Sequence, residues 1–199
     1  RRMAETVARR GGLVVLPQDI PLDIIEMVLE HVKSRHPIFE TPITLAPEDT
    51  VGEALSLIHK RSHGAVIVVD SDNRPVGVFT EYDAVGFDRF TQLKNVMNLD
   101  MVCFTESMSV SEIHDKLVDQ RLSFAPVVNN NGMLVGAITR KGALRSTIYS
   151  PATNSSGQFL TSVAVGINAD PAKRAKALVA LGVDVLVIDT AHGHQERML

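Results

Sequence analysis

Cysteine, tryptophan and long apolar runs are what this sequence has least of. It contains one cysteine, Cys103, and no tryptophan among 199 residues. A single cysteine excludes a disulfide within the chain and fits a reducing compartment, so we expect a cytoplasmic protein. Cys103 lies in a short apolar stretch that we expect to be a strand, and we predict a buried packing residue there rather than a nucleophile.

Membrane segments are also lacking. No apolar run approaches the roughly 18 residues that a membrane-spanning helix needs. We expect no signal peptide, because Glu5, Thr6 and Arg9 interrupt any apolar segment behind the first two arginines. The sequence therefore predicts a protein that does not bind a membrane.

Neither sign of charge dominates the composition. The chain has 20 Lys and Arg against 23 Asp and Glu, which gives a formal net charge of −3. No basic patch with interleaved aromatic residues is present, so we expect no nucleic-acid partner. With 45% hydrophobic residues, the composition is typical of a globular chain of one or two domains.

What the sequence does contain is an internal repeat. Residues 43–85 recur as residues 102–144 with a constant offset and no gap. Two short stretches make this plain, Gly77 to Asp83 in the first copy and Gly136 to Gly142 in the second. The residues identical in both copies are Val51/Val110, Glu53/Glu112, Val68/Val127, Val69/Val128, Val76/Val135, Gly77/Gly136 and Thr80/Thr139.

Each copy predicts a small β-α-β-β-α unit. A short strand leads to Thr50-Val51-Gly52-Glu53 or to Ser109-Val110-Ser111-Glu112, and both segments fit the capping box at a helix start. An apolar strand follows, then the polar turn 70–73 or 129–132, a returning strand and a second helix. One such unit is a marginal core by itself, so we expect the two copies to pack together and to leave clefts at their seam.

The end of the first copy carries a motif for ligand binding. The pattern Gly-apolar-apolar-Thr-x-x-Asp, Gly77 to Asp83, in a tandem repeat resembles a CBS-domain pair, also called a Bateman module. The resemblance implies a site for ATP or GTP, in which the aspartate accepts the ribose hydroxyls and the threonine meets phosphate at a helix start. In the second copy Gly142 stands where the aspartate would be. The residues implied for nucleotide binding are Thr44, Ala65, Val66, Thr80, Asp83 and Thr139. A plain helix cap is the alternative role for Thr80.

The flanks of the repeat predict a parallel α/β structure. Residues 1–10 favour a helix closed by Gly11-Gly12, residues 13–16 a strand, and the segment after Pro21 a helix whose buried face comprises Ile24, Ile25, Val28, Leu29 and Val32. Beyond the repeat, a strand at 159–165, a helix at 172–181 and a strand at 184–188 follow, with Asp170 as the expected N-cap. We divide the chain into segments 1–40, 41–98, 99–149 and 150–199. The flanks are expected to be pieces of a barrel or a doubly wound sheet.

Both flanks resemble the IMP dehydrogenase/GMP reductase family. The resemblance lies in Met3-Ala4 to Gly11-Gly12, in Ala164-Val165-Gly166 and in Gly182 to His194, and within the family it is greatest to an actinobacterial branch of CBS-containing GMP reductases. It implies an α/β fold in which a tandem CBS pair is inserted in part of a TIM (β/α)8 barrel.

The resemblance implies a purine-nucleotide oxidoreductase. In this family a cysteine thiolate attacks C2 of the purine and a nicotinamide cofactor exchanges hydride. We expect a GMP reductase, which converts GMP and NADPH to IMP and ammonia. The alternatives are an IMP dehydrogenase, which oxidises IMP to XMP with NAD, and a free-standing CBS nucleotide sensor. A homo-oligomer, tetramer or octamer, is implied.

No catalytic residue is expected within these 199 residues. The family's nucleophile lies on a glycine-rich loop downstream of the last strand, so Cys103 is not its counterpart and we expect this chain alone to be inactive. Asp189, Thr190 and Ala191 follow that strand and are implied as cofactor-binding residues, since residues at this end of barrel strands form active sites. A helix N-cap is the alternative for Asp189.

Two further expectations concern the surroundings of these sites. His192-Gly193-His194 has no third ligand nearby in sequence, so we predict no metal site. The repeat interrupts the chain after a helix and before a strand, which in a barrel is the face opposite the active site. A nucleotide bound in the repeat would then act at a distance, and we expect ATP and GTP to bias activity in opposite senses.

Overall fold

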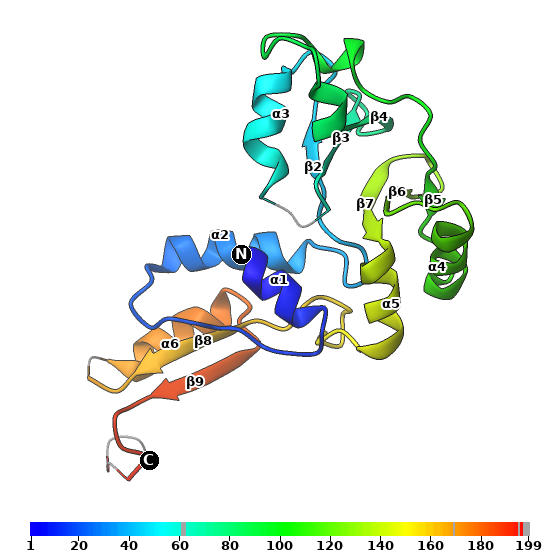
Figure 1. The fold of residues 1–199 in the computed structure, drawn as a ribbon. Helices are drawn as coiled ribbons and strands as arrows, with labels where there is room; N and C mark the ends of the chain where they lie inside the picture. Colours follow the sequence, from blue (N-terminus) through cyan, green and yellow to red (C-terminus); the bar gives the residue numbers. More distant parts are fainter. Residues whose placement is uncertain (61–62, 169, 195, 197–199) are drawn as a thin grey trace. The chain divides into compact units, whose positions relative to one another are not determined.

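The computed structural model describes residues 1–60, 63–168, 170–194 and 196, and the chain divides into two compact units (Figure 1). The flanking unit comprises Arg1–Ile38 and Tyr149–Leu199, and the repeat unit comprises Phe39–Ile148. No helix in the described part of the chain is long and apolar enough to cross a membrane.

The repeat unit contains two three-stranded sheets of the same topology. The first copy has β2 (Ile43–Leu45), α3 (Val51–Ile58), β3 (Ala65–Val69), β4 (Pro75–Thr80) and the short 3-10 helices η1 (Glu81–Ala84) and η2 (Leu93–Asn95). The second has β5 (Phe104–Thr105), α4 (Val110–Asp119), β6 (Phe124–Val128), β7 (Leu134–Thr139) and α5 (Arg140–Ile148). In both, the first two strands are parallel and the last two form an antiparallel hairpin. Even the register irregularity recurs, between Val68/Val69 and between Val127/Val128.

Both predicted capping boxes are present. The hydroxyl of Thr50 accepts from the backbone N–H of Glu53, whose carboxylate accepts from the backbone N–H of Thr50 at 2.8 Å. Ser109 and Glu112 repeat this arrangement at the start of α4. The bonds from Thr50 and Ser109 lower the pKa of the two glutamates below the ordinary value, because they favour the charged form.

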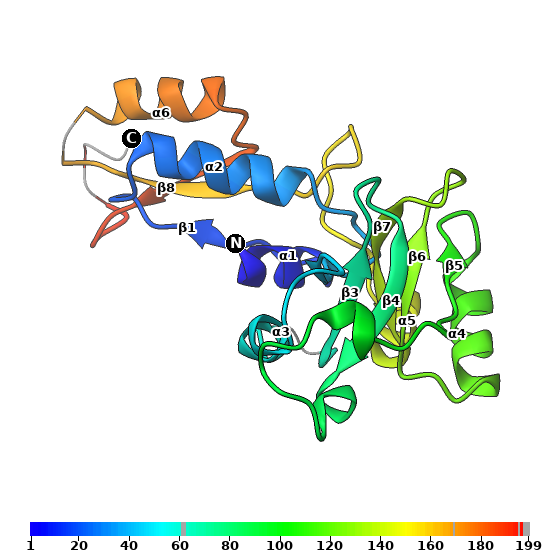
Figure 2. The same ribbon diagram turned by 90° about the horizontal axis from the view of Figure 1, so that it is seen from above.

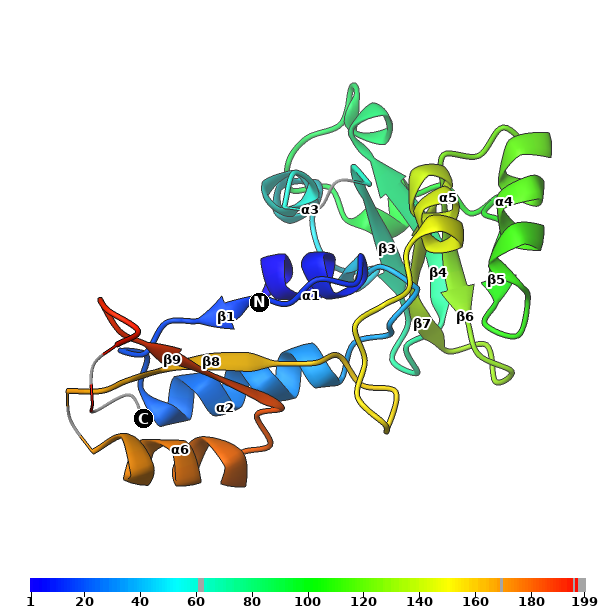
Figure 3. The same cartoon turned by 90° about the horizontal axis from the view of Figure 1, so that it is seen from below.

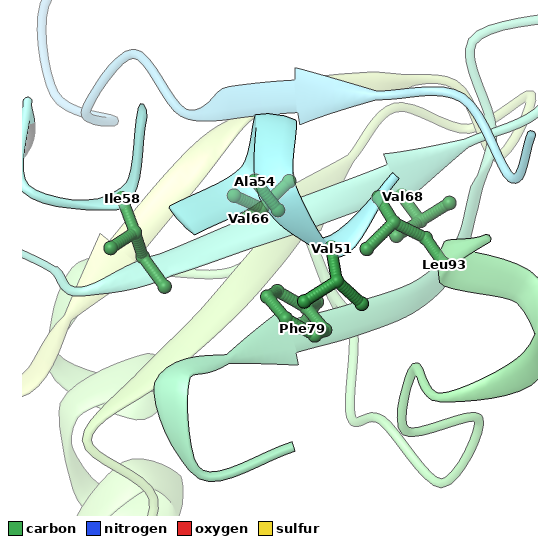
Figure 4. Close-up of a cluster of buried hydrophobic side chains, with 7 residues drawn as sticks. All are labelled: Val51, Ala54, Ile58, Val66, Val68, Phe79 and Leu93. Atoms are coloured by element: carbon green, nitrogen blue, oxygen red, sulfur yellow. The ribbon is translucent and has the colours of Figure 1, made fainter. Parts of the chain in front are cut away.

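The first copy has a closed apolar core between α3 and its sheet. Figure 4 shows Val51, Ala54 and Ile58 of α3 directed toward side chains of β3 and β4. The complete cluster of buried residues is Val51, Ala54, Ile58, Val66, Val68, Phe79 and Leu93. Leu93 comes from η2, so the segment after β4 also covers this core.

The prediction of a second helix in the first copy is wrong. After β4 the chain makes only the four-residue η1, whereas the second copy continues into the nine-residue α5. The helix ends because Val85 is extended and Gly86 follows with φ of +86°, which turns the chain away.

The prediction for Cys103 is wrong as well: the residue is exposed and precedes β5. Partial burial of its thiol raises the pKa, which disfavours the thiolate.

The two copies exchange the segments that precede them. Glu40, before the first copy, pairs with Ala137 on β7, and Asn98, before the second, pairs with Val78 on β4. Both pairings consist of two backbone hydrogen bonds, of 2.8 Å in the first case and of 3.0 and 2.8 Å in the second. Each returning strand is therefore covered at one edge by residues that lie N-terminal to the other copy.

The flanking unit is built on a parallel sheet. Its elements are α1 (Arg2–Ala8), β1 (Val15–Leu16), α2 (Leu22–Lys33), β8 (Ser162–Gly166), α6 (Pro171–Ala180) and β9 (Val185–Asp189). The strand order is β1-β8-β9 and all pairs are parallel, as the apolar strands predict. Figures 2 and 3 show α2 and α6 side by side along β8, and the core between them comprises Ile25, Leu29, Val163, Val165, Leu178 and Val183.

Two details of the flanking unit differ from expectation. Ile24 is not on the buried face of α2, because 39% of it is exposed, whereas Ile25, Val28, Leu29 and Val32 are buried as predicted. The strands β1 and β8 are shorter at their starts than the apolar runs that contain them. An apolar run is longer than the strand it forms when its first residues have no neighbouring strand to pair with.

Asp184 ties the flanking unit together just before β9. Its Oδ2 accepts from the N–H and the hydroxyl of Thr161, at 2.9 and 2.7 Å, and lies 2.9 Å from Lys33 Nζ. Its Oδ1 accepts from the Asn154 amide at 3.3 Å. Partial burial raises the pKa of this carboxyl, but the bonds from Lys33, Thr161 and Asn154 outweigh that effect and lower it overall.

Candidate functional site

Of the expected nucleotide-binding residues of the first copy, Ala65, Val66, Thr80 and Asp83 lie at one end of its sheet, whereas Thr44 lies further along, opposite Ile67. Thr44 lies in β2, and Ala65 and Val66 begin β3, which runs parallel to β2. Thr80 ends β4 and pairs directly with Ala65. Thr44 is exposed, whereas Ala65 and Val66 are buried, so the latter two present only backbone groups to a ligand at this end.

Thr80 and Asp83 form the polar part of this end. Asp83 Oδ2 accepts from the backbone N–H of Thr80 at 2.7 Å and from its hydroxyl at 2.8 Å. These bonds use one carboxylate oxygen, which leaves Oδ1 outside them. The hydrogen bonds fix the carboxylate at the start of η1, and an aspartate held in this way presents an acceptor in a defined direction. The N-cap role weighed for Thr80 is therefore real, and it positions Asp83.

The corresponding threonine of the second copy, Thr139, has different hydrogen-bond partners. Thr139 pairs with Phe124, as Thr80 pairs with Ala65. Its hydroxyl accepts from the N–H of Gly142 at 2.9 Å and donates to Glu40 Oε1 at 3.3 Å. Glu40 reaches this point from the exchanged segment before the first copy, and no motif in the sequence indicates it.

His63 is the second residue that the sequence did not indicate. Its side chain is 1% exposed, its ring stacks on Phe124 with 5.0 Å between the centroids, and its Nδ1 lies 3.6 Å from Glu40 Oε2. Among the described residues, neither ring nitrogen has a hydrogen-bond partner. A histidine before a strand is unremarkable in sequence, so only the three-dimensional arrangement reveals it.

The flanking unit places the expected cofactor residues at the carboxyl edge of its sheet. Asp189 is the last residue of β9 and pairs with Gly166, the last residue of β8. The side chain of Gln18, which follows β1, fills the space that a Cβ at position 166 would need. Asp189 is exposed, and Thr190 donates from its hydroxyl to the carbonyl of His192 at 3.3 Å. This edge therefore offers a carboxylate and a hydroxyl beside the side-chain amide of Gln18, which lies over Gly166.

The chain leaves and re-enters the flanking unit at the opposite edge of its sheet. It leaves the flanking unit after α2 and returns before β8, whose first residue, Ser162, pairs with Val15 and Val185 at the amino ends of the other strands. In the part of the chain that the structure describes, no group of three or more His, Cys, Asp or Glu residues is placed to hold a metal ion.

A model of the IMP dehydrogenase / GMP reductase domain matches residues 1–199, the whole chain. The chain belongs to the IMP dehydrogenase/GMP reductase family. The α/β fold, the sheet end with Thr80 and Asp83 and the sheet edge with Asp189 are thus features of a member of this family.

Relatives of both activities are similar to the chain. It is 46% identical over 199 residues to the GMP reductase of Mycobacterium bovis, and 31% identical over 202 residues to the inosine-5'-monophosphate dehydrogenase of Methanocaldococcus jannaschii. These alignments cover 100% of this chain but 41% and 40% of those proteins. The chain thus spans about two fifths of the length of the curated relatives it matches.

Solved structures of a more distant relative have the same fold. The GMP reductase of Trypanosoma brucei in complex with guanosine 5'-triphosphate matches 99% of this chain and 49% of its own, with a TM-score of 0.67 and 29% sequence identity. A variant of that enzyme in complex with guanosine 5'-monophosphate gives a TM-score of 0.68, with 43% of its own chain covered.

Proposed function

We propose that this chain is the regulatory module and part of the catalytic barrel of a GMP reductase, an oxidoreductase of purine nucleotides. The observation that carries the proposal is the match along the whole chain to the family, with greater identity to a GMP reductase than to an IMP dehydrogenase among the relatives given above. An IMP dehydrogenase is the second candidate, because the same residues match that enzyme as well.

In this proposal the repeat unit is a tandem CBS pair, with copies at 41–98 and 99–149, and it binds purine nucleotides. Two structural features support it: the copies share one topology, and the first presents a fixed Thr80–Asp83 pair at the end of its sheet. Asp83 would accept the ribose hydroxyls and the backbone at Ala65 and Val66 would face the base. ATP and GTP are the proposed ligands. A free-standing nucleotide sensor is disfavoured, because the family match includes both flanking segments.

In this proposal the carboxyl edge of the flanking sheet is the binding site for the cofactor, and it is called the cofactor edge below. Three parallel strands joined through helices are consistent with part of a TIM barrel, whose active site lies at the carboxyl ends of the strands. Asp189, Thr190 and Ala191 would hold the ribose and nicotinamide side of NADPH or NAD, which supplies hydride when bound. In GMP reductase the overall change is GMP, NADPH and a proton to IMP, ammonia and NADP⁺. We propose a cytoplasmic homo-oligomer.

Two measurements on the full protein test this function. Turnover is measured with GMP plus NADPH and with IMP plus NAD, and we expect only the first pair to react. ATP binding is measured by calorimetry for wild type and Asp83→Ala, and we expect binding at the first copy to weaken roughly 10- to 100-fold, as loss of a charge-assisted acceptor would produce.

Asp72→Ala is the matched control, because Asp72 lies in the turn at the opposite end of the same hairpin. Reaction of IMP with NAD alone would transfer the assignment to IMP dehydrogenase. Equal ATP binding by wild type and Asp83→Ala would contradict the proposed nucleotide site.

A further inference from the structure

The second copy lacks the aspartate of the motif, yet a carboxylate still lies at the corresponding place. A Cβ built on Gly142 would come within 2.7 Å of Glu40 Oε1 and within 2.9 Å of Thr139 Oγ1. The side chain of Glu40 thus occupies the space that a side chain at position 142 would need. It also receives a hydrogen bond from the Thr139 hydroxyl, as Asp83 does from that of Thr80.

We propose that Glu40 replaces the missing aspartate of the second copy, and that Glu40, Thr139 and His63 form a second site for the ribose of a purine nucleotide. This inference rests on the proposed nucleotide-binding function of the repeat unit. It adds a residue outside the motif, supplied by a segment that precedes the other copy.

The backbone holds Glu40 in position for this role. Its N–H donates to the carbonyl of Ala137 and its carbonyl accepts from the N–H of Ala137, both at 2.8 Å. Phe39 precedes it and lies directly over Gly136. The first copy does not use its exchanged segment in this way. There Asn98 pairs with Val78, and the Asn98 side chain accepts from the N–H of Asp100.

His63 is the independent sign that a ligand belongs here. Burying a polar ring without a hydrogen-bond partner is unfavourable, and such groups occur where a ligand or water completes the bonding. The ring of His63 is 1% exposed, its Nδ1 faces Glu40 Oε2, and among the described residues both ring nitrogens lack a hydrogen bond. A ligand with hydroxyl and phosphate oxygens offers partners to the carboxylate and to the ring together.

The glycine at position 142 makes the replacement testable by a double exchange. In wild type a side chain at 142 would collide with the Glu40 carboxylate. With Glu40 shortened, that space opens, and Gly142→Asp would restore the order Gly-x-x-Thr-x-x-Asp after rotation of the Thr139 hydroxyl. Rescue by the pair of substitutions is an outcome that a purely structural role of Glu40 would not give.

The experiment is ATP titration by calorimetry on the full protein, with GTP in parallel. We expect two nucleotides bound with wild-type affinity per chain for wild type, one each for Glu40→Ala and Asp83→Ala, and none for the double variant of these two positions. Glu40→Gln is expected to weaken the second site at least tenfold. Glu40→Ala combined with Gly142→Asp is expected to regain two, whereas Gly142→Asp alone is expected to bind one.

Glu106→Ala is the matched control, because the Glu106 backbone bonds to Val128 at the other end of the second sheet. Two nucleotides on Glu40→Ala would overturn the inference while leaving the first site intact. One nucleotide on wild type and two on Glu40→Ala would also overturn it, because Glu40 would then be closing the second site. No binding to wild type would instead overturn the proposed function and this inference with it.

Discussion

At the scale of single residues, Asp184 carries the clearest electrostatic role. Only 16% of its side chain is exposed, and it joins Lys33 of α2, Thr161 before β8 and Asn154 of the returning segment. Hydrogen bonds to a charged group contribute more than bonds between neutral groups. One carboxylate therefore holds α2 and the segment 154–161 to the start of β9.

We expect Asp184→Asn to destabilise the flanking unit by about 1–3 kcal/mol at neutral pH, since the ion pair with Lys33 and a charged acceptor are lost. The pKa of Asp184 is lower in the folded state than its ordinary value of 3.8. The stabilisation is therefore complete above that pH and is lost as the pH falls below it. Urea unfolding of both proteins between pH 7 and pH 3 should show a difference that shrinks only at the acid end.

Asp19→Asn serves as the control, because Asp19 is exposed in the same unit. A difference between wild type and Asp184→Asn that stayed constant down to pH 3 would show that the loss is one of packing, not charge.

Thr80 and Thr139 show how far residue-level prediction extends. The sequence predicted that both would lie at the end of a sheet, and both do, because the strand register follows from the local repeat. The partner of Thr80 was also predictable, since Asp83 is three residues away. The partner of Thr139 was not, because Glu40 is 99 residues away and arrives through a backbone exchange that leaves no mark on the local pattern.

At the scale of elements, the exchanged segments explain two of the repeated glycines. A Cβ on Gly77 would meet Met97 Sδ at 2.5 Å, and a Cβ on Gly136 would meet Phe39 Cβ at 2.7 Å and the Glu40 carbonyl at 3.1 Å. In each case another segment lies directly on the strand. Glycine recurs here because the neighbouring chain approaches too closely for any side chain.

The two glycines should nonetheless differ in their tolerance of alanine. At Gly77 the obstacle is the side chain of Met97, whose Sδ and Cγ can move by rotation about its side-chain bonds and whose Cβ, at 3.2 Å, needs to shift only slightly. At Gly136 it is a Cβ and a backbone carbonyl, which cannot move without shifting the pairing of Glu40. We expect Gly136→Ala to cost about 1–3 kcal/mol and Gly77→Ala less than about 1 kcal/mol.

Urea unfolding of the two variants beside wild type measures this difference. The control is Ala125→Gly in β6, which makes the opposite change on the strand beside β7. Gly132→Ala is unsuitable as a control, because φ of Gly132 is +77°. Equal losses for Gly77→Ala and Gly136→Ala would contradict the assignment of a rigid contact to Gly136 alone.

Helices and strands were predictable to different degrees. Capping boxes and polar turns identified α3, α4 and both hairpins, because these signals lie within a few residues of the elements they define. The second helix of the first copy was predicted by analogy with the second copy and is a 3-10 turn instead. Gly86 was the available signal, since a glycine so soon after a helix start favours a chain reversal.

At the scale of the whole molecule, the flanking unit is too small to be a barrel by itself. It has three parallel strands among the described residues, whereas a TIM barrel needs eight and about 250 residues. Its strands also leave apolar side chains accessible, with Val15, Val187 and Ile188 exposed by 42, 37 and 49%. Such strands need neighbours to be covered.

We therefore expect the 199-residue chain by itself to bind ATP and to show no turnover with GMP plus NADPH or with IMP plus NAD. The repeat unit contains its own core, whereas the cofactor edge is only part of an active site. Calorimetry and an absorbance assay at 340 nm check the two parts, with the full protein as the positive control. Measurable turnover by the isolated chain would contradict the proposed division of roles.

The exchanged segments have a consequence for how such a module can arise. A polypeptide with one copy would leave the edge of its returning strand bare, and it could cover that edge only by taking the leading segment of an identical molecule. Two-fold dimers formed by domain swapping exchange equivalent elements in this manner. Joining two copies in one gene would make that exchange permanent, and it would allow one half to lose a residue that the other half supplies, as we propose for the glycine at 142 and the glutamate at 40.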